Sequence, residues 1–185
     1  MNRLSFKKLE LEGLFEILQN PIKDKRGYLS RVFCNNEISK YGFSNAISQI
    51  NTTLTLKKGT IRGLHFQRYP ATDTKIILCL KGSIFDVVVD IRKDSPTFLK
   101  WISLELSCRK KNMILINKGF AHGFQTLSDD VELLYFHDHE YVSTLDTTIN
   151  PFDPSINIKW PLDKSCISEK DLNGSFISNS NFIGI

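Results

Sequence analysis

Hydrophobic and polar positions in the middle of the chain fall into segments of strand length. Residues 76–80 are continuously apolar (Ile-Ile-Leu-Cys-Leu), and residues 84–91 follow with many β-branched side chains. Such side chains favour strands because they fit a pleated, half-buried surface. The intervening sequence Lys81-Gly82-Ser83 is typical of a turn. The pattern predicts two strands joined as a β-hairpin.

Three further segments have the same character. Residues 101–106 and 131–137 alternate between apolar and other side chains, and residues 113–116 form a short apolar run. Because successive side chains of a strand point to opposite faces, the alternation places Tyr135 and His137 on one face. Short strands at such intervals, separated by turn residues, are typical of an all-β sandwich or barrel.

Helical signals are weak and lie at the periphery. Residues 36–41 predict one or two helical turns, and Ser168-Glu169-Lys170-Asp171 opens like a capped helix or a turn. Residues 173–185 are rich in Ser and Asn, which predicts a loosely ordered tail. No repeat or linker divides the chain, so we expect residues 1–185 to form one domain.

Composition narrows the functional class. With 185 residues, of which 41% are hydrophobic and 24% charged, the chain resembles an ordinary soluble globular protein. No apolar run approaches the roughly 18 residues that span a bilayer, and residues 1–8 lack the apolar core of a secretory signal. The net charge of +4 comes without long basic runs, which argues against a nucleic-acid partner. It remains compatible with a basic pocket for an anionic small molecule.

Cysteine usage points to a reducing compartment. The four cysteines are scattered and form no CxxC pair: Cys34, Cys79, Cys108 and Cys166. We therefore expect reduced thiols in a cytoplasmic protein, with Cys79 a small buried residue inside its apolar run.

Two of the four histidines lie in short glycine-containing segments. His65 lies in Arg62-Gly63-Leu64-His65-Phe66-Gln67, and His122 lies in residues 119–124. Histidine suits proton transfer at neutral pH, and a carboxylate partner would fix its tautomer. The carboxylates that could pair with His65 are Asp86, Asp90, Asp138 and Asp171. A structural histidine bonded to the backbone of a β core is the other interpretation, and the residues alone favour it.

A metal site is the alternative suggested by His137-Asp138-His139-Glu140. Strand alternation puts His137 and His139 on one face, as shared coordination would need. Tyr135 shares that face, however, and no third ligand stands at a usual spacing. We therefore expect an exposed polar strand end and no metal.

A set of motifs in fixed order connects the chain to a known family. From about Arg26 to Asp171 it resembles the dTDP-4-dehydrorhamnose 3,5-epimerases, which are cupin-like sugar-nucleotide epimerases. The matching segments are 26–27, 49–51, 59–67, 75, 86–92, 95–98, 119–124, 153–154, 158–161 and 168–171. The resemblance implies an all-β, cupin-like double-sheet jelly roll with short peripheral helices, and a homodimer.

The resemblance also implies a role for each matching residue. His65 falls on the catalytic base, Asp171 on its carboxylate partner, Tyr135 on the proton donor, and Lys75 on the lysine beside the C4 keto oxygen. Further matching positions contact the substrate: Arg26, Gln49, Asn51, Arg62, His122, Tyr141, Asp146 and Lys170. The implied reaction inverts C3 and C5 of a dTDP-4-keto-6-deoxyhexose without metal or redox cofactor. It uses a nucleotide-sugar substrate, and neither nucleic acid nor a membrane is expected as a partner.

Several positions depart from the family pattern. Arg31 replaces a usual acidic residue, Asp73 replaces a glutamine two positions before the lysine, and Asp146 shortens a usual glutamate. These changes surround the substrate and leave the residues of the reaction in place. They keep open a C3-only epimerase of a related sugar. Two other classes also stay open, namely a metal-dependent cupin enzyme and a sugar-nucleotide binding module without turnover.

Overall fold

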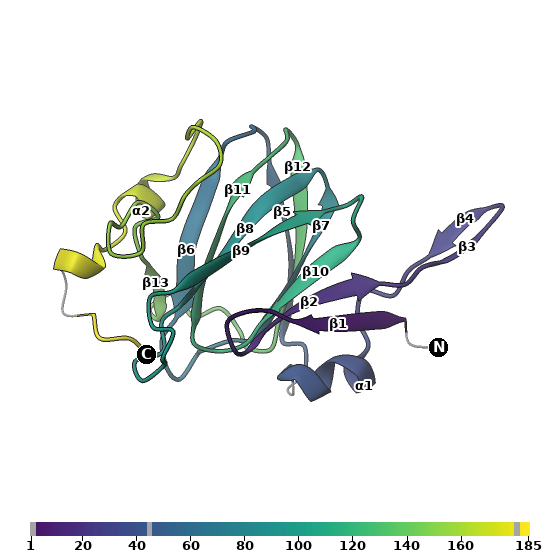
Figure 1. The fold of residues 1–185 in the computed structure, drawn as a ribbon, viewed down its shortest axis with the longest axis horizontal. Coiled ribbons are helices and arrows are strands. Elements are labelled where there is room, and N and C mark those ends of the chain that lie inside the picture. The colour runs from purple at the N-terminus through teal and green to yellow at the C-terminus, as the bar shows by residue number, and fades with distance from the viewer. Residues whose placement is uncertain (1–2, 44–45, 180–181) are drawn as a thin grey trace.

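The computed structural model describes residues 3–43, 46–179 and 182–185, and its two large antiparallel sheets pack face to face (Figure 1). The six-stranded sheet has the order β1 (Leu4–Lys8), β2 (Leu14–Gln19), β10 (Asn112–Ile116), β7 (Lys75–Lys81), β12 (Val131–His137) and β5 (Gln49–Thr55). The five-stranded sheet has the order β13 (Asp146–Thr148), β6 (Ile61–Gln67), β11 (Phe120–Thr126), β8 (Ser83–Asp90) and β9 (Trp101–Ser107). The all-β, double-sheet prediction is confirmed.

The helices are short and peripheral, as predicted. They are α1 (Asn35–Ile38), the 3-10 turn η1 (Ser39–Tyr41), α2 (Glu169–Leu172) and the 3-10 turn η2 (Ile177–Asn179). The predicted cap at Ser168 is present, because its hydroxyl accepts the backbone N–H of Asp171 at the start of α2.

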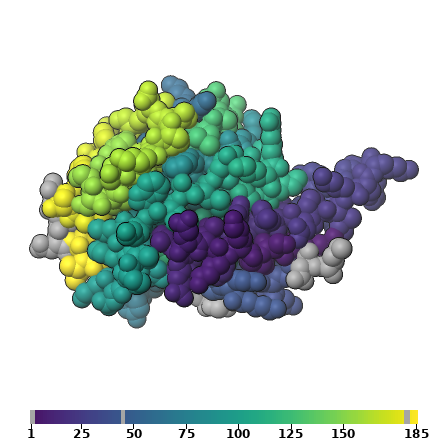
Figure 2. All heavy atoms as spheres, in the orientation of Figure 1, coloured from purple at the N-terminus to yellow at the C-terminus, as the bar shows by residue number. Residues whose placement is uncertain are grey.

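A two-stranded hairpin leaves the body of the molecule. It consists of β3 (Ile22–Asp24) and β4 (Gly27–Leu29), which among the described residues pair only with each other. The ribbon and the space-filling view both show it as an arm that projects beyond the sheets (Figures 1 and 2). All six of its residues are exposed.

The predicted hairpin over residues 76–91 is wrong in its pairing. Both strands form, but β7 pairs with β10 and β12, whereas β8 pairs with β9 and β11. The turn at Gly82 therefore carries the chain from one sheet to the other. The reason is burial: Ile77 and Cys79 of β7 face Ile84 and Val88 of β8 across the space between the sheets.

Three apolar clusters explain the sequence patterns. The cluster between the sheets takes one face of several strands from both sheets, for example Ile77, Ile114, Val88 and Leu133. The outer face of the six-stranded sheet is covered by α1 and the segment after it, and its members include Ile38, Phe43, Ile76, Leu78, Met113 and Leu115. Strands β7 and β10 are thus buried on both faces, and that is why their sequences are apolar runs without alternation.

The outer face of the five-stranded sheet is covered by the C-terminal third of the chain. Leu64, Val87 and Val89 pack there against Ile156, Trp160 and other residues of that segment. Within the predicted tail, Ser175 bridges to Ile149, and the backbone N–H of Ile185 donates to the carbonyl of Ile91 at 2.8 Å. Residues 180–181 of that tail lie outside the described residues, and its loose order and the single-domain boundary stay predictions.

In the described part of the chain no helix is long and apolar enough to span a bilayer. The cytoplasmic location stays a prediction.

Candidate active site

A cavity of about 340 Å³ opens between the two sheets and collects most of the predicted site residues. Its lining comes from β5, β6, β7, β11, β12, β13, α2 and neighbouring loops. The lining residues are Gln49, Asn51, Thr53, Arg62, His65, Phe66, Gln67, Asp73, Lys75, His122, Phe124, Tyr135, His137, His139, Tyr141, Asp146 and Lys170. Of the twelve sequence-predicted site residues, ten line it directly.

Strand register arranges the six-stranded wall in rows. His137 of β12 lies opposite Gln49 of β5 and Lys75 of β7. Tyr135, two residues earlier on the same face, lies opposite Asn51 of β5. Directly opposed residues of antiparallel strands present their side chains on the same face. The wall therefore carries polar groups on three adjacent strands.

The five-stranded wall holds His65 on β6 in contact with a buried carboxylate. His65 Nε2 lies 2.6 Å from Asp171 Oδ1. The other carboxylate oxygen accepts the backbone N–H of Gly63 at 3.1 Å. Asp171 is fixed by its place in α2, whose N-cap is Ser168. The structure thus selects Asp171 from the four carboxylates that the sequence left open.

The environment of Asp171 fixes the tautomer of His65. Burial by itself would raise the pKa of Asp171, but hydrogen bonds from His65 and from the Gly63 backbone outweigh it, and the pKa lies below its ordinary value. An ionised carboxylate only accepts, so His65 Nε2 carries the hydrogen of this pair. The lone pair of the neutral ring then resides on Nδ1, which is available to take a proton.

Gly63 allows the strand of His65 to approach β11 closely. Its φ is +118°, and a Cβ atom there would lie 2.6 Å from Gly123 Cα and 2.7 Å from the His122 carbonyl oxygen. The register of β6 against β11 shifts between His122 and Phe124, which marks a bulge in β6 at Gly63 and Leu64, opposite Gly123. Two glycines thereby bring His65 and His122 side by side on one wall.

Tyr135 occupies the opposite wall from His65. Burial, followed by the charge of Asp86, raises the pKa of Tyr135 above its ordinary value. The phenol therefore keeps its proton at neutral pH and is available as a donor.

A second histidine–carboxylate pair stands beside the first. His122 Nε2 lies 2.7 Å from Asp86 Oδ1, and both side chains are almost fully buried. Burial raises the pKa of Asp86 even though His122 opposes the shift. Its Oδ2 atom is buried and has no hydrogen-bond partner among the described residues. Asp86, one of the sequence candidates for His65, thus belongs to His122 instead.

A third pair lies on the six-stranded wall. Asp73 Oδ2 lies 2.7 Å from His137 Nδ1 and 3.4 Å from Lys75 Nζ. Burial would raise the pKa of Asp73, but the charge of Lys75 and the hydrogen bond from His137 hold it well below its ordinary value. The carboxylate is therefore ionised at neutral pH.

Hydrogen bonds tie together the residues at one end of the cavity. Asp146 Oδ2 accepts from the Tyr141 hydroxyl at 3.1 Å and from Lys170 Nζ. Gln49 Oε1 accepts the backbone N–H of Tyr141 at 3.0 Å. Because Lys170 and Asp171 are neighbours on α2, this short helix contributes Lys170 to the cluster and Asp171 to the bond with His65.

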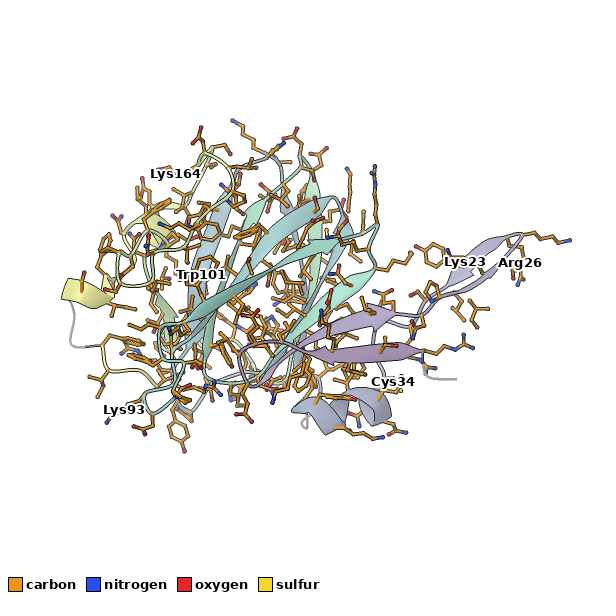
Figure 3. All side chains as sticks on the ribbon, viewed as in Figure 1. Lys23, Arg26, Cys34, Lys93, Trp101 and Lys164 are labelled. Carbon is orange, nitrogen blue, oxygen red and sulfur yellow. The ribbon has the colours of Figure 1, made fainter. Side chains whose placement is uncertain are left out.

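Arg26 is the predicted site residue that lies apart. It occupies the β3–β4 hairpin, bonds to Asp24 at 2.6 Å, and projects beyond the sheets (Figure 3). Arg31, which replaces an acidic residue of the family pattern, forms an ion pair with Glu37 at 2.7 Å. The structure therefore does not bring Arg26 into the cavity of its own chain.

The two histidines of the metal hypothesis bond elsewhere. His137 bonds to Asp73, and His139 Nδ1 lies 2.9 Å from the carbonyl of Glu140. Within residues 3–43, 46–179 and 182–185, no group of three potential ligands could hold a metal ion.

Sequence reasoning missed the partners of two cavity histidines. The pairing of His122 with Asp86 has no local signal, because the two residues lie 36 positions apart. Each partner of the His137–Asp73 pair had a signal of its own in the sequence. His137 shares a strand face with Tyr135, and Asp73 stands where the family usually has a glutamine.

Comparisons with known proteins agree with this geometry. A family model described as dTDP-4-dehydrorhamnose 3,5-epimerase matches residues 8–179. The enzyme of that name from Shigella flexneri is 38% identical over 162 residues, which cover 86% of this chain and 89% of that protein. A dTDP-4-dehydrorhamnose 3-epimerase from Streptomyces niveus is 29% identical over 178 residues, or 96% of this chain and 86% of that protein.

A solved structure extends the likeness to the fold. The crystal structure of dTDP-6-deoxy-D-glucose-3,5-epimerase from Legionella pneumophila, in complex with dTDP-4-keto-L-rhamnose, matches with a TM-score of 0.90 and 32% identity. The match covers 95% of this chain and 94% of that one. The chain described here therefore belongs to the dTDP-4-dehydrorhamnose 3,5-epimerase family of isomerases.

Proposed function

We propose that this chain inverts C3 and C5 of dTDP-4-dehydro-6-deoxyglucose to form dTDP-4-dehydrorhamnose. One observation carries the proposal: His65 and Tyr135 stand on opposite walls of one cavity, on β6 and β12 of different sheets. Inversion of a carbon centre requires a proton to leave from one face and return to the other. A base on one sheet and a phenol on the other meet that requirement.

The chemistry follows from the groups in place. His65 Nδ1 takes the proton from C3, the electrons of the C–H bond form a C3–C4 double bond, and the carbonyl electrons move to O4. The Lys75 ammonium stabilises the charge on O4. Tyr135 then gives its phenolic proton to C3 from the opposite face, and the ketone re-forms. Exchange with solvent restores both groups, and the same cycle at C5 completes the reaction.

The remaining cavity residues support binding of the nucleotide. Arg62 and Lys170 supply positive charge for a diphosphate, for which guanidinium donors have a suitable fork geometry. Tyr141 matches an aromatic residue that lies beside the nucleobase in the family, and Asp146, which accepts a hydrogen bond from its hydroxyl, is a further substrate contact. Further contacts to the sugar come from Gln49, Asn51 and His122. The Legionella pneumophila relative was solved with dTDP-4-keto-L-rhamnose, which supports a dTDP-sugar as the ligand here.

We further propose a homodimer in which the hairpin arm contributes Arg26 to the partner. β5 is an edge strand of the six-stranded sheet, and Ile50 and Leu54 on its outward face are 54% and 51% exposed. Unpaired, apolar strand edges favour association with another chain. Sedimentation at micromolar concentration should give twice the mass of the chain.

Mixing two variants, each of which we expect to be inactive alone, tests the contribution of Arg26. In a heterodimer of Arg26→Ala with His65→Asn, one cavity regains a complete set of residues if the arm serves the partner. We expect the mixture to recover activity. No recovery from a mixture that has exchanged subunits would refute the arrangement.

Isotope exchange distinguishes the proposed reaction from its nearest alternative. We expect incubation with dTDP-4-dehydro-6-deoxyglucose in deuterium oxide to place deuterium at both C3 and C5. Label at C3 alone would identify a C3-only epimerase, as the Streptomyces niveus relative is named. No label at either carbon would identify a binding module.

Variants of the two reacting groups test their roles. We expect His65→Asn to abolish turnover and exchange while the protein stays folded. Tyr135→Phe should block product formation but leave exchange at C3, because deprotonation does not need the phenol. Near-normal activity of His65→Asn would refute its role as the base. Metal analysis of the active protein addresses the remaining metal-dependent alternative, which would require a bound ion in proportion to activity.

A further inference from the structure

The pair of Asp73 and His137 has no part in the reaction as described so far. Both side chains line the cavity, and both are mostly buried, at 5% and 19% exposure. A single oxygen of Asp73, Oδ2, lies 2.7 Å from His137 Nδ1 and 3.4 Å from Lys75 Nζ. One negative charge is thus shared between a histidine and the lysine expected to stabilise the enolate.

The two distances show which partner the carboxylate favours. Charge-assisted hydrogen bonds between an ammonium and a carboxylate are usually about 2.7–2.9 Å long. The contact of Asp73 with His137 is in this range, whereas its contact with Lys75 is longer by about half an ångström. Lys75 has no other ion-pair partner within 4.0 Å in the described part of the chain. Its ammonium is held in place but only partly neutralised.

The ring of His137 is held in place by its neighbours. Its ring stacks on Tyr135 with the ring centroids 6.0 Å apart and the planes 10° from parallel. On the backbone it lies directly opposite Lys75. Because Asp73 is ionised, the Nδ1 atom of His137 carries the hydrogen of the bond between them.

We propose that His137 is a positioning residue that binds Asp73 and thereby keeps the Lys75 ammonium available to the keto oxygen of the substrate. The inference rests on the role given to Lys75 above. Without the bond from His137, the full charge of Asp73 is free to draw the ammonium into a close ion pair. A neutralised lysine stabilises an enolate less, so the barrier of the proton-abstraction step rises.

Substitution of His137 by residues with and without a donor tests the idea. His137→Phe keeps a planar ring beside Tyr135 and removes the hydrogen bond, and we expect kcat to fall about ten-fold with KM changed less than two-fold. His137→Asn places an amide N–H near the position of Nδ1, and it should restore most of kcat. A residue that only filled space would show the opposite order.

A double-mutant cycle supplies the decisive control. The Asp73→Asn variant has no charge to neutralise Lys75, so adding His137→Phe to it should lower kcat by less than two-fold. A full ten-fold loss in that background would show that His137 acts without Asp73 and would overturn the proposal. An unchanged kcat, or a rise of KM alone, in His137→Phe would overturn it as well.

The outcome can be separated from that of the proposed function. Deuterium exchange by the wild-type protein and its loss in His65→Asn test the reaction itself. If both behave as expected and the cycle does not, only the role of His137 fails. Urea unfolding of each variant shows whether a loss of kcat comes from a loss of the fold.

Discussion

Replacing Asp171 by asparagine tests how a buried carboxylate controls His65, the proposed base. Asp171 uses its two oxygens for different donors, His65 Nε2 at 2.6 Å and the Gly63 backbone N–H at 3.1 Å. An amide has one oxygen and one NH₂ group, so Asp171→Asn cannot accept both hydrogens. The side chain is only 4% exposed, and water cannot readily replace the lost bond.

Each orientation of the new amide has a calculable cost. If its oxygen stays with His65, two donors face each other at Gly63, and the unsatisfied buried N–H costs about 1–3 kcal/mol. If the amide turns, its NH₂ donates to Nε2, and the proton of His65 moves to Nδ1. The second orientation keeps both hydrogen bonds, so we expect it to prevail. It removes the lone pair that we propose takes the substrate proton.

The expected result is therefore a folded protein whose proposed base, His65, cannot accept a proton at Nδ1. General-base catalysis contributes about 10²–10⁴-fold to a rate, which corresponds to about 3–5 kcal/mol in the barrier. We expect kcat of Asp171→Asn to fall by that factor, while the free energy of unfolding in urea changes by less than about 1 kcal/mol. Turnover followed by proton NMR measures the first quantity. A folded variant with kcat within ten-fold of wild type would refute the reasoning.

Three further changes test the scaffold. Gly63→Ala places a Cβ 2.6 Å from Gly123 Cα at a φ of +118°, and strain with overpacking should destabilise the protein by about 2–5 kcal/mol in urea and displace His65. Asp90 has a pKa of about 2, because its bonds to Arg92, Ser95 and Thr97 outweigh burial. Because this pKa is lower than the ordinary 3.8, the ionised Asp90 carboxylate stabilises the fold by about 2 kcal/mol above pH 3.8. This stabilisation is lost as the pH falls from 3.8 through about 2. Asp90→Asn should show the same loss of stability at pH 7. Leu133→Ala should cost about 2–5 kcal/mol, since Leu133 is fully buried between the sheets.

The strands could be predicted from sequence because their signals are local. Apolar runs and alternation located β7, β8, β10 and β12 to within a residue or two. Which strand pairs with which is decided by burial across the whole molecule. The turn at Gly82 suits a hairpin and a crossing between sheets equally well, so no local pattern distinguishes them. The hairpin prediction failed for that reason.

The site could be predicted only as far as its residues share a motif or a face. Alternation placed His137 beside Tyr135, as β12 confirms. Asp73 lies in the irregular segment between β6 and β7, where no periodicity constrains the direction of a side chain. The bond between His65 and Asp171 spans 106 positions. Such contacts arise when β6 and α2 meet in the folded chain, and the residues themselves left four carboxylates possible.

Burial distinguishes the three histidine–carboxylate pairs that surround the cavity. A base must touch the carbon it deprotonates, and of the three rings His65 is the most accessible, at 39% exposure. His122 is only 8% exposed, so its ring can direct a hydrogen bond but offers little surface to a substrate. His137 is intermediate and is bound to the carboxylate that also contacts Lys75. The same pair of side-chain types therefore suits proton abstraction in one place, a fixed contact in the second, and control of a neighbouring charge in the third.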